Sequence, residues 1–278
     1  MAATHARIGD TGVLADRLRP VLAECRGELQ TLSSGGEDVG ANVHFLRKNG
    51  KRLRGGLELL GAPRPVLVEL RDLGRLLSIS RDALVRVQTQ RALCEQIGPA
   101  AAADPDFEVA RRQLEFEGLL AGTPPAPTRK FLRARLNAVQ AWLDEAHFDD
   151  PSAVAKRMDR LVTRAEQRLG QLAGKPKRMT AYHEARKAAK AVLGAAQFLF
   201  AAPDARQARE IRRLDRLGEG FGRIQDLCVL QHWLDGRGLT RERLPALHRV
   251  LGLEIRNACA ATRRRAAKCR LEALRVRV

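Results

Sequence analysis

Apolar residues recur at helical spacing along nearly the whole chain. Between Asp10 and Leu32, for example, they fall mostly three or four positions apart, at Val13, Leu14, Leu18, Val21, Leu22 and Leu29. The alternation of β-branched or aromatic residues that marks strands is scarce, and aromatic residues make up only 4% of the chain. Because such a chain buries its apolar side chains by packing helix against helix, we predict an all-α fold.

Breaks rich in glycine and proline divide this pattern into successive helices. The strongest is the segment 122–127, Gly-Thr-Pro-Pro-Ala-Pro, and others lie at 61–63 and 174–176. Asp150-Pro151 predicts a helix start, because it combines a capping side chain with a proline at the first helical position. At Pro20, inside the first helical stretch, we expect a kink or a boundary.

Two of the expected helices carry the same basic pattern, a histidine followed by basic residues three, four and seven positions later. The first copy is His44, Arg47, Lys48 and Lys51. The second copy is His183, Arg186, Lys187 and Lys190. Since an α-helix advances about 100° per residue, each copy forms a single stripe. Cations crowded on one stripe repel each other unless an anion faces them, so both stripes are candidate anion-binding surfaces.

The order of these features indicates an internal duplication. His183 follows His44 by 139 positions, half the length of the chain. A second match keeps the same order, because Arg81-Asp82-Ala-Leu-Val corresponds to Gln225-Asp226-Leu-Cys-Val. We expect Asp82 and Asp226 to be structural and to pair with basic residues across the bundle.

The composition restricts the class of partner. A net charge of +18 and a pI of about 10.9 favour polyanions. The low aromatic content argues against single-stranded nucleic acid, which is bound by stacking. The five cysteines form no CxxC pair and show no metal-ligand spacing, so we expect reduced thiols and no metal or cofactor. The first residues lack a signal-peptide core and no segment is apolar enough to span a membrane, which predicts a cytoplasmic protein without a membrane partner.

The first stripe continues into a longer motif. Residues 43–47 (Val-His-Phe-Leu-Arg) and 51–54 (Lys-Arg-Leu-Arg) resemble the V-H-x-L-R-x-x-x-[KR]-R-L-R signature of the CHAD domain family, named for histidines in an α-helical domain. The second stripe resembles the family's H-x-x-R-x-x-x-K-R-x-R-Y signature as far as Lys190. Beyond it, Ala191, Leu193 and Gly194 stand where the family usually has Arg, Arg and Tyr. Residues 217–230 resemble the family's downstream L-G-x-x-x-D-x-x-V-L pattern. The resemblance therefore covers essentially the whole chain.

This resemblance implies a specific architecture and function. A single domain over residues 1–278 would contain two repeats, 9–148 and 149–278. Each repeat would form a four-helix bundle, and a pseudo-twofold axis would relate the two bundles across a basic central groove. Family members bind inorganic polyphosphate, often at polyphosphate granules in bacterial cells, which implies the same ligand and location here. We expect this chain to bind polyphosphate without acting as an enzyme.

Polyphosphate is a flexible chain of phosphates with no bases to stack, so its site needs arginine forks and lysine charges. The candidate binding residues are those of the two stripes, the continuation of the first stripe, and five arginines on other helices. They are His44, Arg47, Lys48, Lys51, Arg52, Arg54, His183, Arg186, Lys187, Lys190, Arg75, Arg81, Arg160, Arg164 and Arg223. Because only the first motif is complete, we expect the first half to contribute more to binding.

Two other functions fit parts of the pattern. A histidine phosphotransfer bundle would use His44 with the nearby Lys48. A non-specific nucleic-acid binder, or a binder of another polyanion, would use the charge alone, although the low aromatic content makes nucleic acid the less favoured partner. A hydrolase would need a metal site or a carboxylate pair, and no carboxylate cluster is recognisable beside either stripe. The sequence leaves the oligomeric state and the preferred chain length open.

Overall fold

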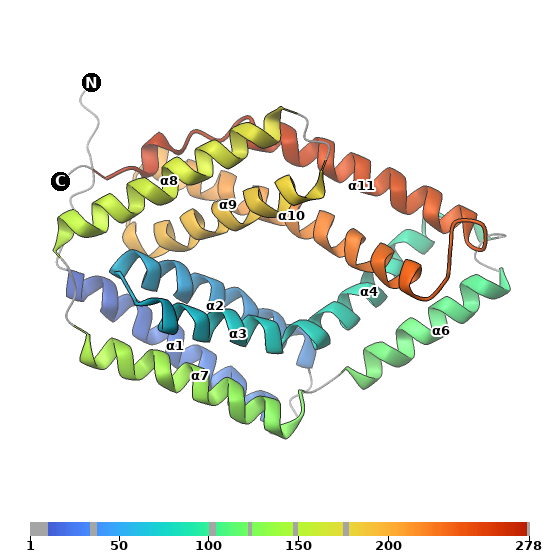
Figure 1. The fold of residues 1–278 in the computed structure, drawn as a ribbon, viewed down its shortest axis with the longest axis horizontal. Coiled ribbons are helices and arrows are strands. Elements are labelled where there is room, and N and C mark those ends of the chain that lie inside the picture. Colours follow the sequence, from blue (N-terminus) through green and yellow to red (C-terminus); the bar gives the residue numbers. More distant parts are fainter. Residues whose placement is uncertain are drawn as a thin grey trace.

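The chain folds into α-helices in every part that the structure describes. The computed structural model describes residues 11–33, 38–99, 104–121, 124–146, 150–174 and 178–276. These ranges contain ten α-helices, one 3₁₀ helix and no strand, so the predicted all-α class is confirmed (Figure 1).

The helices of the first half precede residue 148. They are α1 (Thr11–Ser33), α2 (Val39–Leu60), α3 (Arg64–Leu76), α4 (Ser78–Cys94), α6 (Pro105–Leu120) and α7 (Ala126–Glu145). The helices of the second half are α8 (Pro151–Ala173), α9 (Met179–Leu199), α10 (Ala205–Gly236), α11 (Pro245–Ala266) and the 3₁₀ helix η1 (Leu271–Leu274).

Aspartate caps define several helix starts. The Asp38 side chain accepts a hydrogen bond from the Ala41 amide at 2.8 Å, and Asp150 accepts one from the Ala153 amide at 2.9 Å. The helix start predicted at Asp150-Pro151 is therefore confirmed. At Pro20 the expected boundary is wrong, because α1 continues through this proline from Thr11 to Ser33.

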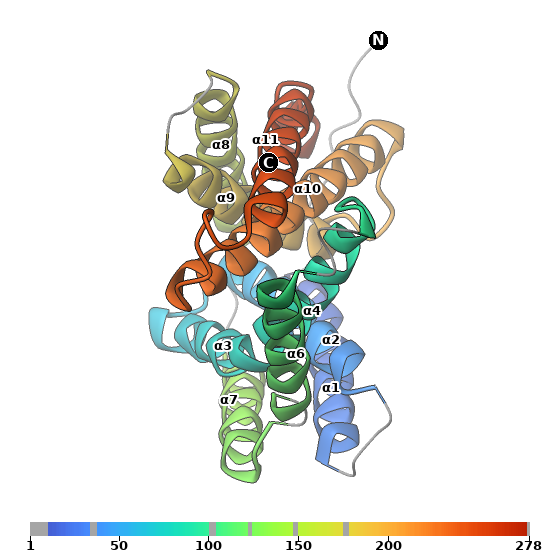
Figure 2. The ribbon, with the colours of Figure 1, turned by 90° about the vertical axis from the view of Figure 1, so that its right-hand side faces the viewer.

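The helices pack into two groups that meet along α2 and α9. Helices α1, α2, α3 and α7 contact one another, and α8, α9, α10 and α11 form the other group, seen from the side in Figure 2. One apolar core runs through both groups, and a second core joins α4 and α6 to α10 and α11. Among the described residues, no helix is both long and apolar enough to cross a membrane.

Two glycines let the backbones of α2 and α9 touch. A Cβ atom added to Gly55 would lie 2.9 Å from the backbone of Gly194, closer than side chains pack. A Cβ atom added to Gly194 would lie 3.4 Å from the Gly55 Cα, an ordinary contact, so Gly55 is the position that the crossing requires to be glycine. The crossing brings the stripes on α2 and α9 to face each other.

Candidate anion-binding pocket

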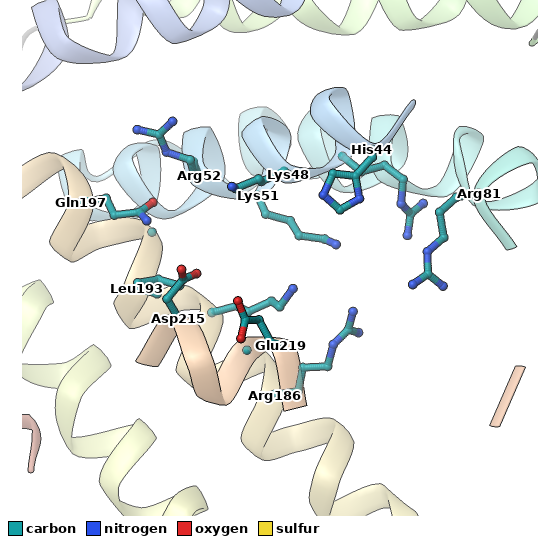
Figure 3. A pocket seen from close by; sticks show the side chains of 14 residues that line it. His44, Lys48, Lys51, Arg52, Arg81, Arg186, Leu193, Gln197, Asp215 and Glu219 are labelled. Atoms are coloured by element: carbon teal, nitrogen blue, oxygen red, sulfur yellow. The ribbon is translucent and has the colours of Figure 1, made fainter. Parts of the chain in front are cut away.

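A cavity of about 310 Å³ lies beside this crossing, between α2, α4, α9 and α10 (Figure 3). Eight of the fifteen residues predicted to bind an anion line it. They are His44, Arg47, Lys48, Lys51 and Arg52 from α2, Arg81 from α4, and Arg186 and Lys190 from α9. The remaining lining residues are Leu193, Gly194, Gln197, Asp215, Gly218 and Glu219. The cavity therefore combines all four members of the first stripe with two members of the second.

Five of the other candidates do not line either cavity described in this structure. Arg54 and His183 are on the two facing helices but outside the lining. The Lys187 amine lies 3.0 Å from a Glu184 carboxylate oxygen, one turn earlier on α9. The largely exposed Arg75 lies 3.7 Å from Asp72, and Arg223 lies 3.1 Å from Glu254. For Lys187, Arg75 and Arg223, a nearby carboxylate already provides the opposite charge.

Arg160 and Arg164, on α8, line a second and separate cavity. They are not among the residues that line the first cavity, and none of the lining residues is shared between the two cavities. The helical spacing of these arginines predicts that they lie on one face of α8, but it does not show which helix packs against that face.

The main cavity is also lined by two carboxylates that were not predicted from the sequence. Asp215 and Glu219 lie one turn apart on α10, facing the basic side chains of α2 (Figure 3). Their spacing of four residues places them on one helix face, which was the available signal, but the sequence did not show which face α10 turns toward the stripes. The statement that no carboxylate cluster lies beside a stripe is thus corrected.

Most of the cations in the cavity have no carboxylate partner. Within the described part of the chain, Lys48, Lys51, Arg186 and Lys190 have no carboxylate oxygen within the 4.0 Å limit of an ion pair. The Nε atom of Arg186 is buried without a hydrogen-bond partner. Seven lysines and arginines against two carboxylates leave a formal excess of five positive charges in the lining. A desolvated excess of this size favours a multivalent anion.

Arg81 is the one lining cation that is ion-paired with another residue of the described ranges. Its guanidinium lies 3.0 Å from an Asp82 carboxylate oxygen and also donates to Asp226 on α10. The prediction of pairing across the bundle is confirmed for Asp226, whereas Asp82 pairs with Arg81, its neighbour on the same helix. These two carboxylates fix Arg81, which is only 18% exposed, at the edge of the cavity and tie the two halves of the chain together.

Two arginines of α2 are held in place by neutral groups. Arg47 donates to the Gly74 carbonyl and, at 2.8 Å, to the Ser78 hydroxyl, at the break between α3 and α4. Arg52 donates to the Asn49 side chain at 3.1 Å. These contacts orient both guanidinium groups without neutralising their charge.

Burial and the neighbouring cations lower the pKa values of several side chains that line the cavity. Burial, and then the charge of Lys190, lower the pKa of Lys51 from 10.5 to about 6. Burial and the charge of Arg186 lower the pKa of Lys190 to about 8. The pKa values of His44, Arg47 and Arg186 are also lowered, in each case first by burial and then by neighbouring cations. All five groups would hold their protons more tightly if an anion entered the cavity.

Comparisons with known proteins identify the fold. A sequence profile of the CHAD domain matches residues 20–235. The crystal structure of the CHAD domain from the plant Ricinus communis is similar with a TM-score of 0.67 and 16% identity, over 97% of this chain and 95% of that one. PptA from Streptomyces chartreusis is similar with a TM-score of 0.67 and 18% identity, over 95% of this chain and 99% of that one. No curated protein matches the chain.

Proposed function

The chain belongs to the CHAD domain family, and from that premise we propose that it binds inorganic polyphosphate in the pocket between α2 and α9, without acting on it as an enzyme. The observation that carries this proposal is the charge of the lining, where most of the lysines and arginines lack a carboxylate partner. A multivalent anion would supply the missing negative charge.

The chemistry of the lining fits phosphoryl oxygens. Arg47 and Arg186 offer guanidinium groups without a carboxylate partner in the described ranges that can donate hydrogen bonds to a phosphoryl group. Lys51 and Lys190 offer compact charges that follow a flexible chain. Among the described residues that line the cavity there is no phenylalanine, tyrosine or tryptophan, so bases would find no stacking surface. This favours polyphosphate over nucleic acid.

We further propose that the cavity is the central part of a basic groove between two bundles that arose by duplication and are related by a pseudo-twofold axis. This arrangement is supported by the cavity, where Arg186 and Lys190 of the second stripe face four members of the first stripe. Binding to polyphosphate granules in the cytoplasm would follow from the ligand.

A histidine phosphotransfer function has weaker support. His44 lines the cavity, but His183 does not, and the cations around His44 lie where they would hold a whole anion. A phosphohistidine that survives base and is lost in acid would be the sign of phosphotransfer.

Calorimetric titration with polyphosphate of defined length tests the proposal. Replacing Lys51→Met and Lys190→Met together should weaken binding at least tenfold, since both amines lie in the cavity. The matched control replaces Arg75→Gln and Lys187→Gln, which removes two cations outside it, and should change the affinity less than about twofold because both are already paired. Equal losses from the two double variants would refute the pocket. Displacement of polyphosphate by duplex DNA at equal phosphate concentration would refute the ligand.

A further inference from the structure

A second cavity, of about 270 Å³, lies between α8, the end of α2 and the start of α3. Three arginines of α8 line it, Arg157, Arg160 and Arg164. The other lining residues are Glu58, Gly61, Ala62, Leu67 and Leu161. Because these arginines are three and four positions apart, they project from one face of α8.

The cavity has an excess of positive charge. Arg160 and Arg164 are exposed, and neither makes a hydrogen bond or an ion pair with another residue in the described ranges. Glu58 is the one carboxylate in the lining, so three guanidinium groups leave an excess of two positive charges. Cations at this spacing on one helix repel each other, and a bound anion would relieve that repulsion.

The third arginine is built into the fold. Gly61 ends α2 with a φ of 84°, a left-handed conformation that favours glycine. A Cβ atom at Gly61 would lie 2.5 Å from the Nη2 atom of Arg157, so the guanidinium occupies the space that a side chain would fill. Arg157 also donates to the Leu59 carbonyl at 3.4 Å. Its charge therefore offsets the negative end of the α2 dipole, which would otherwise repel an anion here.

The two cavities are separated by the helix crossing. The last α2 residues of the first cavity are Lys51 and Arg52, and the first α2 residue of the second is Glu58. Between them, α9 touches α2 at Gly55, where the backbone of Gly194 leaves no room for a side chain. The contact between α2 and α9 therefore lies between the two cavities along α2.

We propose that this second cavity is a separate binding site for a compact phosphate-type anion. Arg160 and Arg164 lie one turn apart, so their guanidinium forks can bind neighbouring phosphoryl groups. Arg157, fixed against Gly61, supplies a third charge. With fewer cations than the first pocket, the site binds more weakly.

Titration of the full chain with tripolyphosphate at moderate salt tests this site. The expected result is two binding events per chain. The double variant Arg160→Gln and Arg164→Gln should remove the weaker event and leave the stronger one. The matched control Lys156→Gln and Arg168→Gln removes the same charge from the same helix, outside the cavity, and should retain both events.

The outcomes separate this site from the pocket between α2 and α9. Loss of the stronger event alone in the Lys51→Met and Lys190→Met variant supports two independent sites. If that variant keeps both events while the Arg160→Gln and Arg164→Gln variant loses one, the second site stands and the first fails. A single event in the unmodified protein, or an equal loss in the α8 control, overturns the second site.

Discussion

Anion binding to the pocket between α2 and α9 should take up about one proton at pH 7. With a pKa of about 6, Lys51 is protonated in only about one in eleven empty molecules at that pH. Phosphoryl oxygens beside the amine would return its pKa to about its ordinary value of 10.5, so binding adds about 0.9 of a proton. Lys190, with a pKa of about 8, adds about 0.1.

The charged groups that face Lys51 determine that binding takes up a proton instead of releasing one. The cations are Arg47 on α2, Arg81 on α4, and Arg186 and Lys190 on α9. The carboxylates in the lining are Asp215 and Glu219 on α10. Burial and these cations outweigh the carboxylates, so the amine loses its proton in the empty pocket. Affinity should therefore fall about tenfold per pH unit between pH 6 and pH 8, where Lys190 largely keeps its own proton, and should stop depending on the protonation of Lys51 below pH 6.

Calorimetry at pH 7 in buffers with different ionisation enthalpies measures this uptake. The slope of the observed enthalpy against the buffer's ionisation enthalpy gives the number of protons, and a long polyphosphate minimises titration of its own ends. Lys51→Met should reduce the slope by about 0.9, leaving the uptake by Lys190 and by His44, whose pKa an anion would also raise. Lys187→Met, which removes a lysine outside the pocket, should leave the slope unchanged. A slope near zero in the unmodified protein would refute the reasoning.

Three further predictions follow from the same contacts. Lys51→Met should stabilise the protein at pH 7 by a few kcal/mol, seen as a Tm several degrees higher, because the folded state no longer deprotonates a buried amine. Since the folded pKa of Lys51 lies below its unfolded one, stability of the unmodified protein should rise from pH 6 to pH 10, and in urea denaturation the variant should lose this slope between pH 6 and pH 8, below the pKa of Lys190. Gly55→Ala should lower the free energy of unfolding by about 1–3 kcal/mol in the same assay, because the new methyl group would meet the backbone of Gly194 at 2.9 Å. Arg186→Gln should weaken polyphosphate binding more than Arg54→Gln, which contradicts the order expected from the completeness of the two motifs; a larger effect at Arg54 would restore that order.

The sequence predicted the helices well because their signals are local. Apolar spacing, glycine and proline breaks, and the cap at Asp150 depend on neighbouring residues, and they placed the helix that begins at Pro151 correctly. The contacts that shape the pocket are not local. Arg81 and Asp226 are 145 positions apart, and the facing of α10 toward α2 depends on the whole packing arrangement. For this reason the carboxylates Asp215 and Glu219 were missed.

Local charge pairing also explains which candidate cations reach a cavity. Each lysine or arginine that lines the first pocket lacks an acidic residue three or four positions away in the sequence. The lysine and arginine candidates that line neither cavity all have an acidic residue at this spacing. These pairs are Arg54 with Glu58, Arg75 with Asp72, Lys187 with Glu184, and Arg223 with Glu219 and Asp226.

The physical reason is that residues at this spacing are neighbours on a helix, so an acid there can pair with the cation before any ligand does. In the structure, Lys187 and Arg75 form such pairs with the residue three positions earlier. Arg160 and Arg164 have no acidic residue at these positions, and they line the second cavity. They therefore group with the cations of the first pocket, and the same absence of a local partner leaves their charge available to an anion.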